Sequence, residues 1–124
     1  MHTTFTVIAS TERLTHVEIT GALDVQHTRE IELKFTATTA GRHKPVIIDI
    51  SKVDFIASSG IGLLVQVART LSLDKHPTIL LAPNETIAHT IRIAKLDSML
   101  QIASNLEAAT ALAQLPSLTS ERLR

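Results

Sequence analysis

The chain has 124 residues, of which 44% are hydrophobic, 19% are charged and none is cysteine. This length suits one core rather than two domains, and the missing cysteine excludes a disulfide framework, a thiolate metal site and a cysteine nucleophile. Twelve basic and twelve acidic residues give a formal net charge of zero, which argues against nucleic-acid binding because that function needs a basic face.

No apolar run approaches the roughly 18 residues that a membrane span requires, and the first residues lack the basic and apolar regions of an export signal. We therefore expect a cytoplasmic protein that does not insert into a membrane. The polar segment after Pro116 predicts a frayed tail over residues 116–124. The folded domain is then expected over residues 1–115.

Alternating side chains in the first twenty residues predict two strands, over 4–8 and 14–19, joined by a turn as an edge hairpin. A helix is expected over 25–39, with Asp24 as its N-cap, Ile31 and Phe35 on its buried face and Gly41 at its end. The β-branched run over 46–50, which follows Pro45, predicts a strand buried on both faces.

From residue 61 the apolar period becomes helical, because Leu64, Val67, Ala68 and Leu71 form one stripe. A strand over 78–82, a helix capped by Asn84, a short strand near 99–102 and a helix over about 105–114 complete the order β-β-α-β-α-β-α-β-α. Strands that alternate with helices predict a single α/β domain with an open, mixed, mostly parallel sheet and helices packed on it.

Two serines stand where the helix after the central strand begins. Ser58 is the expected N-cap, since a serine there accepts a hydrogen bond from a first-turn N–H. Gly60 and Gly62 are each about 1 kcal/mol poorer than alanine in a helix, so we interpret them as leaving the backbone bare for another molecule. A phosphate on Ser58 or Ser59 would meet free N–H groups and the positive end of the helix dipole, and would add a charge of about −1.5 to −2. The segment predicts a phosphorylation switch.

The stretch DISKVDFIASSGIG at 49–62, with GALD at 21–24, resembles the STAS domains of bacterial anti-sigma factor antagonists. The signature of that family runs approximately D-x-S-x-V-x-F-[IM]-D-S-[ST]-G-x-G, and the resemblance covers about the whole chain. It implies that Ser58 is phosphorylated by an anti-sigma factor serine kinase, with Ser59 as the second choice, and that a phosphatase acts on phosphorylated Ser58. Ala57 stands where the signature has aspartate, which removes a charge beside the phosphoacceptor.

A partner-binding surface is expected around Ser58. Asp24 should lie near it, because functional crevices of open α/β sheets lie beyond the carboxyl ends of the parallel strands. On the helix wheel Ile61, Val65 and Arg69 fall to one side of Ser58, and the wheel leaves open whether Ile61 and Val65 are an exposed apolar patch or core. The expected partner-binding set is Asp24, Ala57, Ser58, Ser59, Gly60, Ile61, Gly62, Val65 and Arg69.

The hypothesis that follows is a non-enzymatic binding module, a monomer or weak dimer without cofactor or metal. The resemblance implies that it sequesters an anti-sigma factor kinase, frees a sigma factor for transcription and lets the kinase go when phosphorylated. Two alternatives remain open: a subunit of a larger assembly, such as a stress-sensing scaffold or a phospholipid ABC transporter, and a small nucleotide or lipid binder. Catalysis is not expected, since the six histidines lack metal-site spacing and neither G-x-S-x-G nor a phosphate loop is present.

Overall fold

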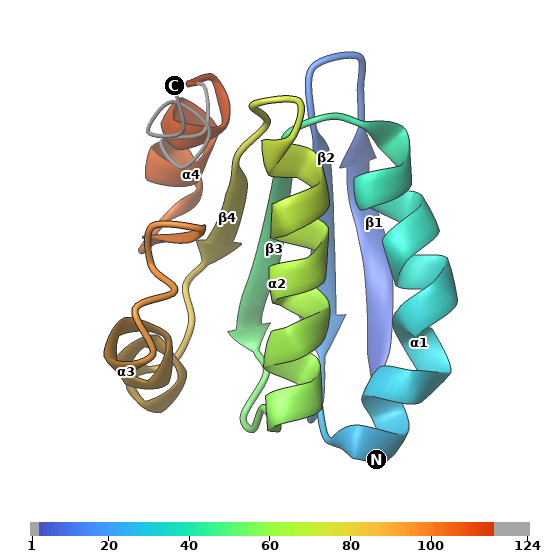
Figure 1. Cartoon of the computed structure of the whole chain (residues 1–124), viewed down its shortest axis with the longest axis vertical. Coiled ribbons are helices and arrows are strands. Elements are labelled where there is room, and N and C mark those ends of the chain that lie inside the picture. The colour runs from blue at the N-terminus through green and yellow to red at the C-terminus, as the bar shows by residue number, and fades with distance from the viewer. Residues whose placement is uncertain (1–2, 116–124) are drawn as a thin grey trace.

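Five strands lie side by side in the order β1-β2-β3-β4-β5. The computed structural model describes residues 3–115, and its strands are β1 (Thr4–Ser10), β2 (Thr15–Thr20), β3 (Val46–Lys52), β4 (Thr78–Leu81) and β5 (Leu100–Ala103). β1 is antiparallel to β2, and the other neighbouring pairs are parallel (Figure 1). The edge hairpin and the mixed, mostly parallel sheet are therefore confirmed, whereas the tail expected over 116–124 lies outside the described residues.

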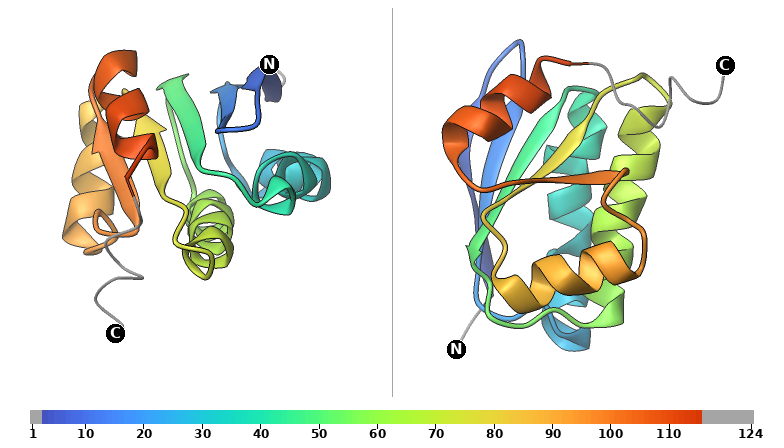
Figure 2. Two further views of the ribbon diagram at one scale, coloured as in Figure 1. Left: turned by 90° about the horizontal axis from the view of Figure 1, so that it is seen from above. Right: turned by 90° about the vertical axis from the view of Figure 1, so that its left-hand side faces the viewer.

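Helices connect the strands in the predicted order. They are α1 (Val25–Thr38), α2 (Ser58–Ser72), α3 (Glu85–Ile93) and α4 (Leu106–Ala113), with a short 3₁₀ turn η1 (Ala40–Arg42) after α1. α1 and α2 pack on one face of the sheet and α4 packs on the other, as the end-on view in Figure 2 shows. This is a three-layer arrangement in which the central strands lose contact with water on both sides.

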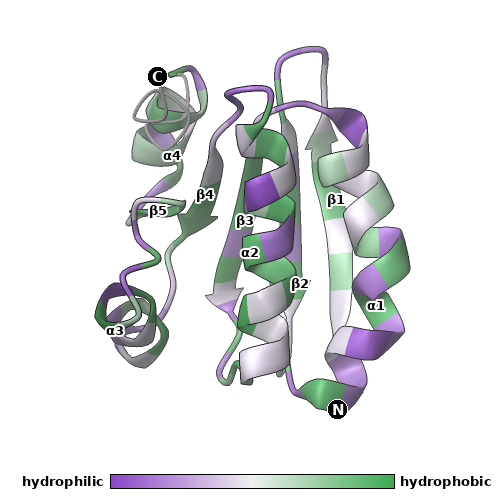
Figure 3. Ribbon diagram, viewed as in Figure 1, coloured by the Kyte–Doolittle hydropathy of each residue, from purple (hydrophilic) through white to green (hydrophobic). Residues whose placement is uncertain are grey.

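β3 is the centre of both cores. Ile48 belongs to the cluster under α1 and α2, Ile47 belongs to the cluster under α4, and both are 1% exposed or less. Figure 3 shows the apolar character of β3 and β4, and the nearly neutral colour of the first turn of α2. Burial of β3 on both faces, predicted from its β-branched run, is confirmed.

The end of α1 differs from the prediction. The helix ends at Thr38 and its C-cap is Thr39, whose hydroxyl donates to the carbonyl of Phe35 at 2.7 Å. Gly41 lies inside η1 rather than at the helix end, and His43, with φ of 54°, takes the left-handed conformation at the end of this turn. The threonine hydroxyl satisfies a terminal carbonyl locally, so the chain turns without the glycine cap that the sequence favoured.

Candidate functional site

The amino ends of α1 and α2 lie at the same edge of the molecule as the carboxyl ends of β2 and β3, at the bottom of Figure 1. The loop over 53–57 runs along this edge between β3 and α2. In open α/β sheets this is the edge where binding sites form. The geometry below therefore concerns this loop and the helix starts on either side of it.

Backbone hydrogen bonds fix the loop to the start of α1. The Leu23 N–H donates to the Phe55 carbonyl and the Ala57 N–H donates to the Leu23 carbonyl, both at 2.8 Å, and Leu23 forms an isolated parallel bridge with Ile56. From the other side, the side-chain amide of Asn84 donates to the Val53 carbonyl at 3.4 Å. The bridge brings Asp24, one residue after Leu23, to the edge where Ser58 begins α2, as the sequence predicted.

The N-cap of α2 is Ala57 and not Ser58, so the predicted capping role of Ser58 is wrong. Ala57 is extended, with φ −84° and ψ 168°, and no side chain caps the helix. The reason is tertiary: the bonds to Leu23 hold Ala57 extended, and the helix starts at Ser58, one residue earlier than a serine cap at position 58 would place it. The intrahelical bonds begin with the Ile61 N–H donating to the Ala57 carbonyl at 3.0 Å, so the N–H groups of Ser58, Ser59 and Gly60 precede the ladder.

The two serines differ in access to solvent. Ser58 is exposed, whereas Ser59 is half-buried, and its hydroxyl oxygen is buried and finds no hydrogen-bond partner among residues 3–115. A hydroxyl that a kinase modifies has to reach the active site of that enzyme. Ser58 meets this requirement in the folded domain, and Ser59 does not.

The two glycines also differ, although both were predicted to leave the backbone bare. A Cβ at Gly60 would lie 2.8 Å from Cγ1 of Ile56 and 2.9 Å from the carbonyl oxygen of Leu23, so this glycine is required by packing. A Cβ at Gly62 would meet nothing within 4 Å, and the residue is exposed. No contact within residues 3–115 therefore requires glycine at position 62.

Asp24 is the N-cap of α1, as predicted. Its carboxylate oxygen Oδ1 accepts the backbone N–H of His27 at 2.8 Å and lies 2.8 Å from Nδ1 of the same histidine. The hydrogen bond from the backbone N–H lowers the pKa of Asp24 below its ordinary value, and the histidine ring acts in the same direction. Asp24 therefore keeps a negative charge at this edge, next to the uncapped start of α2.

The remaining candidates spread along α2. Ile61 and Val65 are partly buried and pack against the core, so they are neither a free patch nor fully buried. Arg69 is exposed in the last turn, about 16 Å along the helix axis from Ser58 at 1.5 Å per residue. It is therefore separate from the first turn that the other candidates share.

Two exposed apolar side chains at this edge were not among the predicted binding residues. Val25 begins α1 and is 56% exposed, and Phe55 in the loop is 54% exposed. Their backbones are held near each other by the Leu23–Phe55 hydrogen bond. No clear signal in the sequence indicates the exposure of Phe55, because its apolar neighbours in the loop, Val53 and Ile56, do pack in or against the core.

Within residues 3–115, no three histidine, cysteine, aspartate or glutamate side chains come close enough to hold a metal ion. In the same part of the chain, none of the helices combines the length and the apolar character that a membrane crossing demands.

The chain belongs to the STAS domain family, because the model of that family matches residues 6–109. Its fold is that of solved anti-sigma factor antagonists. The structure of the Bacillus cell fate determinant SpoIIAA in the phosphorylated form superposes with a TM-score of 0.67 and 24% identity, covering 88% of this chain and 99% of that chain. An anti-sigma factor antagonist from Mycobacterium paratuberculosis gives a TM-score of 0.69 and 18% identity, covering 90% and 95%. A STAS domain protein from Planctomyces limnophilus gives 0.70 and 20%, covering 91% and 99%.

Proposed function

We propose that this chain is an anti-sigma factor antagonist whose binding to an anti-sigma factor serine kinase is switched by phosphorylation of Ser58. The observation that carries the proposal is the exposed hydroxyl of Ser58 in the first turn of a helix that has no side-chain cap. Membership in the STAS family and the fold shared with SpoIIAA, which has been solved in a phosphorylated form, support it.

A phosphate on Ser58 would be compatible with the fold and would still change how a partner binds. The first-turn N–H groups and the helix dipole favour an anion at this point. Because Ser58 is exposed, the phosphate keeps much of its hydration in the free protein. In a complex the same group, with a charge of about −1.5 to −2, would lose water against the partner, and that cost opposes binding.

The surface around Ser58 can also supply affinity to the unmodified protein. Phe55 and Val25 offer exposed apolar area at the same edge as the serine, and Gly62, four residues further along α2, is an exposed glycine without a side chain. Aromatic side chains dominate the energy of many interfaces. A partner that covers these residues would necessarily desolvate Ser58.

The test uses three variants of the full chain and a pull-down from the cells that make it. Ser58→Ala should retain a serine kinase of the anti-sigma type, and Ser58→Asp should lose it. Ser10→Asp adds the same charge to an exposed residue at the end of β1, beside the start of β2 and away from the edge that holds Ser58, and should bind as the parent does. Equal retention of the kinase by Ser58→Ala and Ser58→Asp would contradict the proposal. Peptide mapping of the isolated protein should find phosphate on Ser58, and an unmodified serine under every growth condition would contradict the switch.

One observation favours a second function, that of a constitutive subunit in a larger assembly. Ala57 lacks the charge that the family signature has beside the phosphoacceptor, which suits an interface that is never phosphorylated. Gel filtration of the protein isolated from its cells separates the two functions. A large, stable assembly without a kinase supports the subunit, and a small species whose partner depends on Ser58 supports the switch.

A further inference from the structure

A trough runs along the free edge of β5, at the opposite end of the sheet from β1. It consists of two adjoining cavities of about 800 and 310 Å³ that share Arg92 and Ile102. The larger lies between α3 and β5, and the smaller continues past Gln101 to Leu112 of α4. Cavities of about 300–1,000 Å³ are the usual size of ligand sites, and this pair is elongated along a strand.

The strand beside the trough has unused backbone groups. Within residues 3–115, β5 pairs with β4 alone. The Ala103 carbonyl accepts the Ala82 N–H at 2.7 Å, so Ala103 turns its backbone groups toward β4. Because the backbone direction alternates along a strand, Leu100 and Ile102 turn their backbone groups away from β4. The Leu100 N–H already donates to the Leu96 carbonyl at 2.7 Å, so Ile102 is the residue of β5 that offers both its N–H and its carbonyl to the trough. An extended peptide could pair with them.

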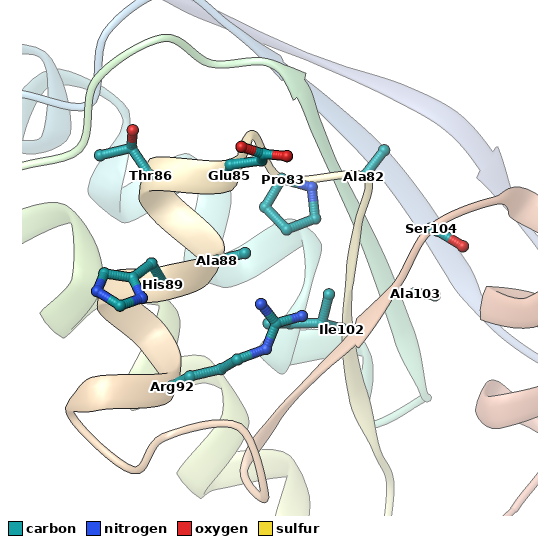
Figure 4. Close-up of a pocket in the computed structure, with 10 residues that line it drawn as sticks. All are labelled: Ala82, Pro83, Glu85, Thr86, Ala88, His89, Arg92, Ile102, Ala103 and Ser104. Carbon is teal, nitrogen blue, oxygen red and sulfur yellow. The ribbon is translucent and has the colours of Figure 1, made fainter.

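The charges along the trough favour one kind of peptide. Arg92 is exposed, and Figure 4 shows its side chain reaching across the larger cavity toward Ile102. No acidic side chain of residues 3–115 forms an ion pair with it. Glu85 lines the larger cavity beside Pro83, and Asp97 lines the smaller one, so the cation is flanked by acidic residues at both ends. A complementary peptide would carry an acidic side chain at its centre, opposite Arg92, and no acidic side chains near its ends, where Glu85 and Asp97 lie.

The floor of the trough suits a backbone that comes close. Ala88 and Ala103 line it and are 6% and 3% exposed, and Ala82 and Ser104 add two more small side chains. Small residues leave room for alternate side chains of an added strand, which lie on one face two residues apart.

We propose that this trough binds an extended segment of a partner protein, which adds to β5 as a sixth strand and places a central acidic side chain on Arg92. Main-chain hydrogen bonds supply affinity and the pockets beside the strand supply specificity in this mode of recognition. Since β5 has four residues, the ladder is short and the complex is transient. The trough does not include Ser58, so the proposal does not depend on the phosphorylation switch.

The test begins with random heptapeptides displayed on phage and panned against the full chain. We expect enriched peptides with a central aspartate or glutamate, and ¹⁵N chemical shifts that move at Gln101, Ile102 and Arg92 when such a peptide is added. Arg92→Glu should weaken binding by about tenfold or more, as expected for the loss of a charge-assisted contact. Arg29→Glu reverses another exposed arginine, on α1, and should leave binding within about twofold of the parent.

A second pair of ligands separates strand addition from a simple anion site. A copy of the selected peptide with N-methylated backbone nitrogens should bind poorly, because it cannot donate to β5. Free glutamate at about 1 mM should cause no shift, since one carboxylate supplies little affinity alone. The proposal is overturned if no peptide is enriched, if binding survives Arg92→Glu or N-methylation, or if free glutamate reproduces the shifts.

Discussion

Replacing Ala57 by aspartate should stabilise the protein, because α2 starts without a side-chain cap. The backbone of Ala57, with φ −84° and ψ 168°, nearly matches that of Asp24, with φ −80° and ψ 180°, whose carboxylate caps α1 at 2.8 Å from the His27 N–H. A carboxylate at position 57 can therefore reach the Gly60 N–H without moving the chain. In other proteins, replacing an N-cap aspartate by alanine lowers the stability of the helix or the protein by about 0.5–2 kcal/mol.

The expected gain is about 1 kcal/mol. An entropy of unfolding of about 2.1 cal/mol/K per residue over 124 residues converts this into a rise in Tm of about 4 °C. Ala57→Asn is the matched control, because it supplies an acceptor without a charge. Differential scanning calorimetry of the parent and both variants at neutral pH measures the effect.

The pH dependence follows from the sign of the pKa change. Capping lowers the pKa of the new carboxyl in the folded state, so its contribution is present above the unfolded pKa and is lost as the pH falls through the folded one. Ala57→Asn should keep its gain in acid. If neither variant raises Tm, the first-turn N–H groups of α2 are already satisfied, and the argument that this helix end favours an anion is refuted.

Three further residues give sharp expectations. Gly60→Ala should lower the free energy of unfolding by about 1–3 kcal/mol because its Cβ would overlap Ile56, whereas Gly62→Ala should raise it by about 1 kcal/mol. Urea denaturation of both variants measures these changes. Equal effects of the two substitutions would contradict the packing role of Gly60. Because the pKa of Asp24 is lowered in the fold, its stabilising effect should be present at neutral pH and be lost as the pH falls below about 4. In Asp24→Asn the free energy of unfolding, measured by denaturation at several pH values, should depend less on pH. If its pH dependence is unchanged, that dependence comes from other groups.

The sequence was sufficient for the order of the elements, because long periodic segments decide between helix and strand. β3 and α2 illustrate this, since a β-branched run gives way to an apolar stripe with helical spacing at a clear boundary. Asp24 and Asn84 were found as N-caps for the same local reason: each side chain bonds a backbone N–H three residues later. The end of α1 was missed for a local reason, the bond from the Thr39 hydroxyl to the Phe35 carbonyl, whereas the features missed at the candidate site depend on contacts between distant segments.

Ser58 is the clearest case. Nothing near it in the sequence indicates that Leu23 holds Ala57 extended, because the two residues pair across 34 positions of chain. The same contact separates the roles of the two glycines, since a Cβ at Gly60 would collide with Leu23, whereas a Cβ at Gly62 would meet nothing within 4 Å in residues 3–115. The half-burial of Ile61 and Val65 was likewise decided by neighbours in space, as the angle of a side chain on a helix wheel does not say how far the neighbouring elements extend.

The bridge between Leu23 and Ile56 fixes the backbone of the proposed binding surface, and a fixed backbone limits how a partner can distinguish its two forms. Main-chain bonds anchor the loop before Ser58 to the start of α1, and the Ser58 side chain is exposed. The outline of the domain is therefore expected to be nearly the same with and without a phosphate. A partner would have to discriminate by the cost of desolvating the phosphate and by electrostatic repulsion, and mobile ions screen the repulsion over about 8–10 Å near physiological ionic strength. Discrimination between the two forms should then weaken as salt is added, whereas a switch that worked by changing shape would be insensitive to it.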